Sequence, residues 1–410
     1  MSSRTSLAST DPELYAAIAA EYRRQEEFLE LIASENYVSP AVLEAQGSTL
    51  TNKYADGYPG ARTYSGCEYV DVAERLAIAR AKQLFGAGYA NVQPYSGSSA
   101  NAAVYAALMR PGDRLLGLQA AHGGHITHGD TSSFAGQLFD VVHYGVGPTG
   151  WLDYDRIEAL ARRHRPKVIV AGFSAYAQVF DWQRFRVIAD AVDAYLVADM
   201  AHVAGLVAAG LYPNPVPIAD VTTTTTHKTL RGPRGGMLLA RDATLGARLD
   251  AAVYPGQQGG PLMHVVAAKA VAFAEALQAE FRRYQRRVVA NAKVLAAGLS
   301  ARGFRLVTGG TENHMLMLDL ETRPLDAATA TLVLESAHIA VNAIPLPGTD
   351  DGRLGLRLGT PAVTTRGLDE PAVAELAVWV ADLLDDPGAA VIERVRDRVL
   401  GLCKAHPVYG

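Results

Sequence analysis

The sequence predicts an α/β protein with a large domain built on a mostly parallel sheet, followed by a smaller C-terminal α+β domain. Between residues 71 and 240, short apolar segments with strand character alternate with helical patterns. Such alternation implies right-handed crossovers and a sheet that is covered on both faces. Residues 304–400 carry shorter strands and helices, and 410 residues exceed what one hydrophobic core normally holds together.

The chain begins with a polar stretch, Met1 to Pro12, that lacks the apolar core of a secretory signal. From Asp11 to Leu31, apolar residues recur among charges at helical spacing after an Asp-Pro start signal, which predicts an amphipathic helix. Residues 33–69 are rich in tyrosine, charge and glycine. A loop of that composition is expected to line a site rather than to fill a core.

The alternating segment divides into individual elements. Helices are predicted at 71–85, 98–109, 153–164 and 183–193. Strands are predicted at 114–118, 139–143, 167–171, 195–199 and 220–225. Ligands of parallel sheets bind beyond the carboxyl ends of the strands, so the loops after these strands are the expected place for a site.

One long amphipathic helix is predicted over 265–298, where it would connect the two domains. With a boundary near 285, the chain divides into an N-terminal arm (1–30), a large domain (31–285) and a small domain (286–410). The small domain is predicted to hold strands at 305–307, 314–319 and 353–358 and helices at 326–337 and 369–384.

Composition narrows the classes of function. The chain is 49% hydrophobic and 20% charged, an ordinary balance for a soluble globular protein. A formal net charge of -4 gives no electrostatic reason for a nucleic-acid partner. Cys67 and Cys403 are the only cysteines, which excludes a disulfide framework and a Cys-rich zinc site and fits a reducing cytoplasm. The chain has no run of about 18 to 20 apolar residues, the length that a membrane-spanning helix requires.

Lys228 follows a threonine-rich strand and precedes a turn that contains Gly232, Pro233 and two further glycines. An apolar pocket and neighbouring cations, here Arg231 or Arg234, would lower the pKa of its amine and make it a nucleophile. The alternative is a surface lysine in a threonine-rich loop. The residues around it favour the nucleophile.

Residues 96–101 form a turn of small residues that opens a helix. Free N–H groups at a helix start, with hydroxyls around them, suit a phosphate ester. Serine and glycine at such a place also cap helices without any ligand, so this signal is weak by itself.

Asp199 ends an apolar strand, and a buried carboxylate needs a partner. The protonated pyridine nitrogen of pyridoxal phosphate would be one, and a structural aspartate that caps the next helix is the alternative. His122, His125 and His128 could suggest a metal site, but the intervening glycines and the lack of acidic ligands disfavour it. His125 is instead predicted to stack on a flat cofactor ring.

A phosphate cradle, a loop histidine, a strand-end aspartate and an activated lysine, in that order, describe a Schiff-base enzyme that uses pyridoxal 5′-phosphate. The sequence resembles the serine hydroxymethyltransferase family over most of its length. The motifs that carry the resemblance are 31–36 (Leu-Ile-Ala-Ser-Glu-Asn), 199–205 (Asp-Met-Ala-His-Val-Ala-Gly), 224–230 (Thr-Thr-Thr-His-Lys-Thr-Leu), 258–264 (Gln-Gly-Gly-Pro-Leu-Met-His) and 359–362 (Gly-Thr-Pro-Ala).

The resemblance implies a fold-type I pyridoxal phosphate enzyme with a seven-stranded sheet. It implies that Lys228 links covalently to the cofactor, that Asp199 partners the pyridine nitrogen and that His125 stacks on the ring. The further cofactor-binding positions would be Tyr54, Gly97, Ser98, Ser174, His202, His227 and Gly260. Tyr54 and Gly260 would come from the second subunit of an obligate homodimer, and pairing of dimers into tetramers stays open.

The resemblance also implies the substrate site. Arg357, with Ser34 and Tyr64, would bind the amino-acid carboxylate, which suits the bidentate geometry of a guanidinium. Asp56, Tyr64 and His227 would act beside Lys228 and His125 in catalysis. In the family's reaction a β-hydroxy amino acid releases its side chain as an aldehyde, and tetrahydrofolate takes the one-carbon unit.

The chain departs from the family's pattern on the folate side. Asp56 stands where members have glutamate, and Thr63 where they have the first of two tyrosines. Further departures are Ser65 for glycine, Tyr95 for histidine, Ser99 for glutamine, the shortened segment 341–345 and the rebuilt loop 348–353. The cofactor half is retained and the folate half is altered, which predicts a weakened tetrahydrofolate site.

The predicted function is reversible aldol cleavage and transfer at Cα of a β-hydroxy amino acid, either serine and glycine or an α-substituted analogue such as α-methylserine. An alternative is a folate-independent threonine aldolase or transaldolase that passes a glycyl unit to a larger aldehyde. A third possibility is a non-catalytic relative that only binds a partner. The intact Lys228, Asp199, His125 and Arg357 argue against it.

Overall fold

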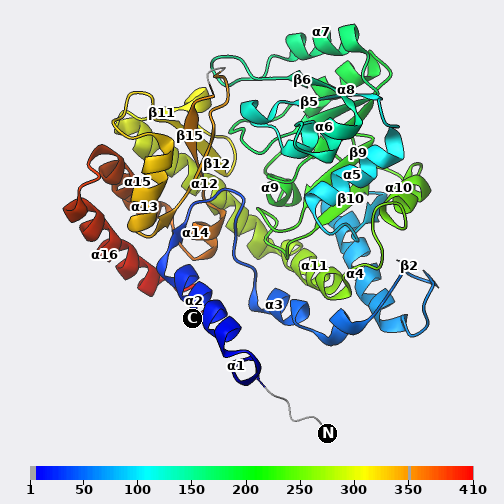
Figure 1. Cartoon of the computed structure of the whole chain (residues 1–410), viewed down its shortest axis with the longest axis horizontal. Helices are drawn as coiled ribbons and strands as arrows, with labels where there is room; N and C mark the ends of the chain where they lie inside the picture. Colours follow the sequence, from blue (N-terminus) through cyan, green and yellow to red (C-terminus); the bar gives the residue numbers. More distant parts are fainter. Residues whose placement is uncertain (1–5, 350–351, 410) are drawn as a thin grey trace.

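The computed structural model describes residues 6–349 and 352–409 (Figure 1). Met1 to Thr5 of the polar N-terminus and Asp350 and Asp351 of the rebuilt loop lie outside the described residues. A seven-stranded sheet forms the centre of the larger part of the molecule. Its strands, in spatial order, are β4 (Tyr89–Asn91), β10 (Gly236–Ala240), β9 (Val221–Thr225), β8 (Tyr195–Asp199), β7 (Val168–Gly172), β5 (Arg114–Leu118) and β6 (Asp140–Tyr144).

This sheet is mostly parallel, as the sequence predicts. Only β10 runs antiparallel to its two neighbours, β4 and β9. The helices around it are α3 (Pro40–Gln46), α4 (Glu68–Phe85), α5 (Gly97–Leu108), α6 (Phe134–Leu138), α7 (Tyr154–His164), α8 (Trp182–Asp190), α9 (Ala204–Ala208), α10 (Gly246–Val253) and α11 (Met263–Ala276). The strands and helices predicted for residues 71–240 are confirmed to within a few residues, whereas β4, β10 and the helices α3, α6, α9 and α10 were not predicted.

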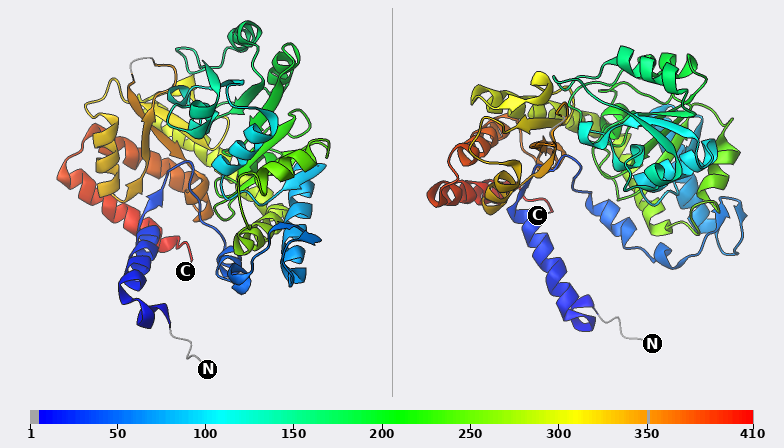
Figure 2. Two further views of the ribbon diagram at one scale, coloured as in Figure 1. Left: turned by 45° about the vertical axis from the view of Figure 1, so that its right-hand side comes forward. Right: turned by 45° about the horizontal axis from the view of Figure 1, so that its top comes forward.

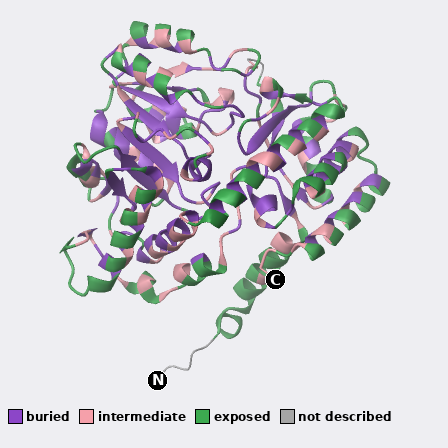
Figure 3. Cartoon of the chain, turned by 180° about the vertical axis from the view of Figure 1, so that it is seen from behind, coloured by how far each residue is buried: buried purple, intermediate pink, exposed green. Residues whose placement is uncertain are grey.

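Side chains on alternate sides of each strand enter two hydrophobic clusters. Val168 and Val170 of β7 pack in one cluster with residues of α5 and α10. Ile169 and Ala171 of the same strand pack in the other cluster, with α4, α7, α8 and α11. Both faces of the sheet are therefore covered, and its central strands are almost wholly buried, whereas the edge strand β6 is partly exposed (Figure 3).

The C-terminal part holds a smaller antiparallel sheet in the order β11 (Arg305–Leu306), β12 (Met315–Asp319), β15 (Leu354–Gly359) and β14 (Asn342–Pro345). Its helices are α12 (Ala279–Ala301), α13 (Ala327–Ser336), α14 (Pro361–Thr365), α15 (Glu370–Asp385) and α16 (Ala389–Ala405). Met315 and Met317 of β12 join the core of the large sheet, whereas Leu316 and Leu318 join the C-terminal core. Figure 2 shows the two parts side by side.

The prediction of one helix over 265–298 is wrong. The helix ends at Ala276 and a new one starts at Ala279, because Gln278 has an extended backbone that interrupts the hydrogen-bond ladder. α11 packs against α3 and α4, whereas α12 packs against α15. The two halves of the predicted helix therefore take their directions from different neighbouring helices. The predicted boundary near 285 falls inside α12, and the domain limits stay a prediction.

The N-terminal arm projects from the body of the molecule (Figures 1 and 2). It contains α1 (Leu7–Thr10) and α2 (Pro12–Glu27), and no residue of either helix is buried. The predicted helix stops at Glu27 rather than Leu31, because Leu29 and Glu30 form β1, which pairs with β13 (Ile339–Ala340). Among the described residues no helix has the length and hydropathy needed to cross a bilayer.

Candidate active site

The candidate site lies beyond the carboxyl ends of the parallel strands. Asp199 is the last residue of β8, and Ser174 follows β7 by two residues. Lys228 follows β9 by three residues, and His125 lies in the loop after β5. Arg357 reaches the same place from β15 of the C-terminal sheet, because its Nη1 donates to the backbone oxygen of Ser174 at 2.7 Å.

The threonine-rich strand β9 is fully buried, and the threonine hydroxyls in it and after it, Thr222 excepted, make hydrogen bonds inside the described part of the protein. Thr223 Oγ1 donates to Asn101 Oδ1 at 2.6 Å, and Thr229 Oγ1 donates to the backbone oxygen of His202 at 2.9 Å. The turn after Lys228 closes with Arg231 in the left-handed region, at φ 60°. Asn36 Nδ2 donates to the backbone oxygen of Lys228 at 3.0 Å, which fixes the lysine's backbone from the opposite side.

The Lys228 side chain is nearly buried, with 9% of its surface exposed. Burial lowers the pKa of its amine to about 8; the charge of Asp199 opposes that shift, while those of Arg357 and Arg234 add to it. At neutral pH roughly a tenth of such an amine is uncharged, far more than for an exposed lysine. This supports the predicted nucleophile, although the cation beside it is Arg234 rather than Arg231.

Three donors hold the carboxylate of Asp199. Oδ2 accepts from Asn101 Nδ2 at 3.0 Å and lies 3.1 Å from His128 Nε2, while Oδ1 accepts from the N–H of Ala201 at 3.0 Å. His128 Nδ1 accepts the N–H of His125 at 3.2 Å, so a neutral His128 carries its proton on Nε2, facing Asp199. Burial alone would raise the pKa of Asp199, but the hydrogen bond from His128, with a further one from Asn101 and other electrostatic contributions, outweighs it and keeps that pKa below its usual value.

His125 is held as a neutral ring. Its Nδ1 accepts the N–H of Thr127 at 3.2 Å and lies 2.7 Å from Thr127 Oγ1. Burial, with a smaller contribution from His128, lowers the pKa of His125 to about 4. A neutral, fixed imidazole at the cavity wall suits stacking on a flat aromatic ring.

The start of α5 forms an anion cradle. Ser96 caps the helix, and its Oγ accepts the N–H of Ser99 at 3.0 Å. The first N–H groups of a helix have no partner within it, so those of Gly97 and Ser98 are free for a ligand. A Cβ on Gly97 would lie 2.7 Å from Thr225 Cγ2. Only glycine therefore allows the turn to pack this closely against β9.

Arg357 faces the cavity without an acidic partner among the described residues. Its Nη2 lies within 3.3 Å of Ser34 Oγ, and its Nε donates to Asn342 Oδ1 at 3.3 Å. Burial lowers the pKa of Arg357 to about 10, so the guanidinium still carries its charge at neutral pH. A buried cation of this kind fits the carboxylate of a substrate.

These groups surround one cavity of about 320 Å³. It is lined by Ser34, Glu35, Ser96, Gly97, Ser98, Asn101, His125, Ser174, Asp199, Ala201, His202, Thr225, His227, Lys228, Arg234 and Arg357. Among the described residues the buried Nδ1 of His227 has no hydrogen-bond partner, which leaves a donor or acceptor for a ligand. An anion cradle, a carboxylate for a ring nitrogen, a flat neutral ring and an amine together fit pyridoxal phosphate.

The other predicted site residues form a separate group on the same chain. The rings of Tyr54 and Tyr64 lie 5.0 Å apart, and a Cβ on Gly260 would lie 2.9 Å from Asp56 Oδ1. Tyr95 Oη donates to the backbone oxygen of Gly260 at 2.7 Å. None of these residues lines the cavity around Lys228. We call Tyr54, Asp56, Tyr64, Tyr95 and Gly260 the tyrosine patch.

The residues that depart from the family's pattern also have defined neighbours. Ser99 Oγ lies 3.0 Å from Ser96 Oγ beside the cradle. The shortened segment forms β14, which pairs with β15 and so places Asn342 against Arg357. In the rebuilt loop, Gly348 has φ 88°, and a Cβ there would lie 2.6 Å from the backbone oxygen of Gly147. This part of the loop therefore rests on the large-sheet part of the molecule.

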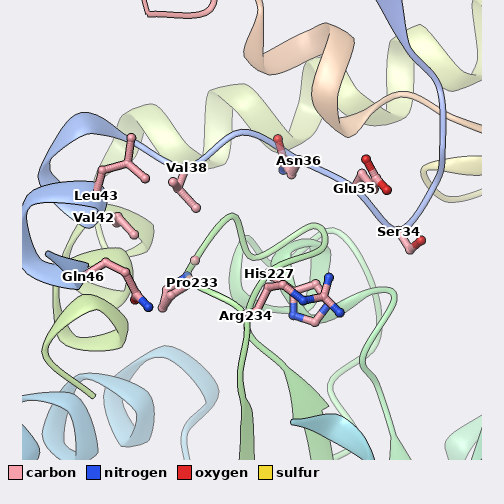
Figure 4. A pocket seen from close by; sticks show the side chains of 11 residues that line it. Ser34, Glu35, Asn36, Val38, Val42, Leu43, Gln46, His227, Pro233 and Arg234 are labelled. Atoms are coloured by element: carbon pink, nitrogen blue, oxygen red, sulfur yellow. The ribbon is translucent and has the colours of Figure 1, made fainter. Parts of the chain in front are cut away.

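A second cavity of about 460 Å³ adjoins the first and shares Ser34, Glu35, His227 and Arg234 with it. Figure 4 shows His227, Pro233 and Arg234 on one side of this cavity, facing the extended segment from Ser34 to Val38. The cavity is partly open, so it offers a route by which groups from outside this chain could approach the site.

Sequence reasoning did not assign roles to Asn36, Asn101, His128 or Asn342. Asn101 and His128 contact Asp199 directly. Their positions in the sequence offered a signal for this role, because Asn101 lies three residues after Ser98 and His128 three residues after His125, both predicted to bind the cofactor. Asn36 and Asn342 contact the site from distant parts of the chain, which no local pattern indicates. Within the described residues no group of three or more His, Cys, Asp or Glu side chains is arranged to hold a metal ion.

Comparison with known proteins gives one consistent result. A family model described as "Serine hydroxymethyltransferase" matches residues 7–380. Relatives named serine hydroxymethyltransferase from Alkalilimnicola ehrlichii, Methylococcus capsulatus and Xanthomonas campestris pv. campestris are 61%, 59% and 58% identical to this chain. Each match covers 98% of this chain and 98% of the relative.

Proposed function

The chain belongs to the serine hydroxymethyltransferase family of pyridoxal phosphate-dependent transferases, and on that premise we propose that it catalyses reversible hydroxymethyl transfer at Cα of an amino acid. The substrates are serine and glycine or an α-substituted analogue such as α-methylserine, and tetrahydrofolate, the family's one-carbon acceptor, binds at a weakened site. The observation that carries this proposal is the convergence of Lys228, Asp199 and Arg357 on one cavity.

Arg357 binds the substrate carboxylate with Ser34 and so places Cα next to Lys228. Arg357 is buried, and a low local dielectric strengthens the pairing of guanidinium and carboxylate. Pyridoxal phosphate would supply an electron sink for the bond that breaks at Cα. Asp199 would hold a proton on the ring nitrogen, His125 would cover the ring face, and the N–H groups of Gly97 and Ser98 would hold the phosphate.

We further propose that the site is completed by a second copy of the chain. The tyrosine patch carries Asp56, whose buried Oδ1 has no hydrogen-bond partner among the described residues, and Tyr54 and Tyr64 are about half exposed. Asp56, Tyr54 and Tyr64 do not line the cavity around Lys228 of their own chain. In a dimer they would line the corresponding cavity of the partner chain. Asp56 would then move the proton of the substrate's β-hydroxyl group.

A second candidate is folate-independent cleavage of threonine or another β-hydroxy amino acid. Two observations favour it: threonine replaces an aromatic residue at position 63, and the rebuilt loop carries Gly348 against Gly147. Cleavage of Cα–Cβ needs only the cofactor with Lys228, Asp199, His125 and Arg357, so it survives loss of the folate site.

One experiment separates these functions. The purified protein is incubated with serine, threonine or α-methylserine, each with and without tetrahydrofolate, and the released glycine or alanine and aldehyde are measured. Hydroxymethyl transfer predicts that tetrahydrofolate accelerates glycine release from serine, or alanine release from α-methylserine. Fast threonine cleavage without such acceleration supports the second candidate, and no turnover of any substrate by yellow, cofactor-loaded protein contradicts both.

A further inference from the structure

Lys269 is a buried lysine that has no part in the site as described so far. It lies on α11, with 1% of its surface exposed. Its Nζ donates to the backbone oxygens of Val92 at 2.7 Å, Gly236 at 2.8 Å and Pro94 at 3.0 Å. An ammonium has three protons, so all of its donors are used. Burial lowers the pKa of Lys269 to about 7.

The three carbonyls belong to the two segments that meet at the start of α5. Val92 and Pro94 lie between β4 and the Ser96 cap, and Gly236 begins β10. The N–H of Gly236 donates to the Pro94 oxygen at 3.0 Å. A Cβ on Gly236 would lie 2.1 Å from the Ser96 oxygen and 3.0 Å from the Gly97 nitrogen. Lys269 therefore joins the two backbones that form the rear wall of the anion cradle.

The charge of Lys269 also acts electrostatically on a residue of the cavity, His227. His227 lines the cavity, and burial lowers its pKa to about 3 with further contributions from Lys228, Arg234 and Lys269. No carboxylate lies within ion-pair distance of Lys269 among the described residues, and Glu74 is the carboxylate whose charge acts on it from farther away, raising its pKa against the effect of burial. A buried positive charge behind an anion site favours a dianion over a neutral ligand.

We propose that Lys269 is a positioning residue for the cofactor's phosphate group: its ammonium holds the 92–97 segment against β10, so that the N–H groups of Gly97 and Ser98 face the cavity. This inference rests on the proposed function, because it takes the ligand of the cradle to be the phosphate of pyridoxal phosphate. Lys269 acts through the backbone and touches neither the cofactor nor the substrate.

The test compares two ligands that differ only in the phosphate. Full-length protein stripped of cofactor is titrated with pyridoxal 5′-phosphate and with pyridoxal by equilibrium dialysis. For Lys269→Met, which keeps the length of the stem and removes the donors, the dissociation constant for pyridoxal phosphate should rise by about tenfold or more. That for pyridoxal should change by less than about threefold. Lys293→Met, at an exposed ion pair with Glu312, is the control and should change neither.

A second variant disturbs the lysine without removing it. A Cβ on Gly235 would lie 2.5 Å from Lys269 Cε and 2.9 Å from its Nζ, so Gly235→Ala should displace the ammonium and weaken phosphate binding in the same selective way. Equal weakening of both ligands in the two variants would show a purely structural role and overturn the inference. Unchanged binding of pyridoxal phosphate would overturn it as well. Failure of the unmodified protein to bind pyridoxal phosphate would instead contradict the proposed function.

Discussion

Lys228 and Asp199 show how burial turns two ordinary side chains into a matched pair. Burial lowers the pKa of the lysine to about 8, whereas hydrogen bonding from His128 keeps the pKa of the aspartate below its usual value despite burial. The lysine is thereby partly neutral and the aspartate fully ionised near pH 7. A Schiff-base enzyme needs an amine that attacks an aldehyde and an anion that holds a ring nitrogen protonated.

The first prediction concerns pH. Attack on the cofactor aldehyde requires the uncharged amine of Lys228, so the rate at which stripped protein takes up pyridoxal phosphate should rise from pH 6.5 and level off above about 8. Stopped-flow absorbance measures this rate.

The identity of the reactive lysine can be tested directly. Lys228→Ala should not develop the visible absorbance band of the covalent linkage. Borohydride reduction of the unmodified protein, followed by peptide mapping, should find the label on Lys228. A label on another lysine would contradict the assignment.

The second prediction concerns Asp199. Asp199→Ala removes the counter-charge for a protonated ring nitrogen, so turnover should fall by more than about tenfold, since 1.36 kcal/mol in the barrier is a factor of ten. Asp199→Asn keeps the size of the side chain and removes its charge, and it should be similarly impaired. Steady-state assays with saturating cofactor measure this. Near-normal turnover of either variant would show that the charge of Asp199 is not used.

At the scale of elements, a buried polar network holds the loop that carries the tyrosine patch. Arg62 Nε donates to Asp71 Oδ1 at 2.9 Å, and Nη2 donates to Glu74 Oε2 at 2.5 Å. Arg62 Nη1 also donates to the backbone oxygens of Ala55 and Gly57, on either side of Asp56. One guanidinium thus sets the position of the loop against α4.

The third prediction tests that network. Arg62→Leu leaves Asp71 and Glu74 buried without their cation, which should destabilise the fold by about 3–5 kcal/mol. Urea denaturation monitored by fluorescence measures the change in the free energy of unfolding. Arg114→Leu removes an exposed ion pair with Asp140 and should change stability by less than about 1 kcal/mol. A loss for Arg62→Leu no larger than for this control would show that the network contributes little.

The fourth prediction concerns the altered folate side of the same loop. An aromatic contact contributes about 0.5–1.5 kcal/mol, so Thr63 in place of tyrosine should weaken tetrahydrofolate binding. Asp56 is one methylene shorter than glutamate, which displaces its carboxylate by about 1.5 Å. Thr63→Tyr with Asp56→Glu should therefore raise tetrahydrofolate affinity and folate-dependent transfer. Calorimetric titration in the presence of glycine measures the affinity, and tight binding by the unmodified protein would refute the weakened site.

At the scale of the whole molecule, the exposed arm and the separate tyrosine patch both fit the second subunit that we propose. Leu14, Ile18 and Tyr22 lie along one side of α2 and are 48%, 52% and 47% exposed. An apolar stripe of this kind on a projecting helix needs a partner surface. In the proposed dimer, the residues of the tyrosine patch would likewise enter the cavity of the other chain.

The fifth prediction uses complementation between subunits. Lys228→Ala and Asp56→Ala should each be inactive as homodimers. After unfolding and refolding together, mixed dimers would hold one site with both residues intact, so the mixture should recover up to about a quarter of normal activity. Each variant refolded alone is the control. No recovery, despite proven mixed dimers, would show that Lys228 and Asp56 act from the same chain.

The sequence by itself determined the alternating α/β fold, and it predicted the residues that we propose to bind the cofactor. Periodicity and strand ends are local properties, so β5, β7, β8 and β9 could be placed within about a residue. Motifs are local too, which is why Lys228, Asp199, His125 and the Ser96 turn could be named from their neighbours in the chain.

Tertiary structure alone decided the features that depend on contacts between distant segments. The break between α11 and α12 lies at Leu277 and Gln278, where no glycine or proline predicts the end of a helix. It arises because α11 and α12 pack against different helices. Lys269 appears in sequence as one polar residue in an apolar helix, and its role depends on three carbonyls more than thirty residues away along the chain. The separation of the tyrosine patch from the cavity of its own chain has the same cause: long-range packing, which no local pattern encodes.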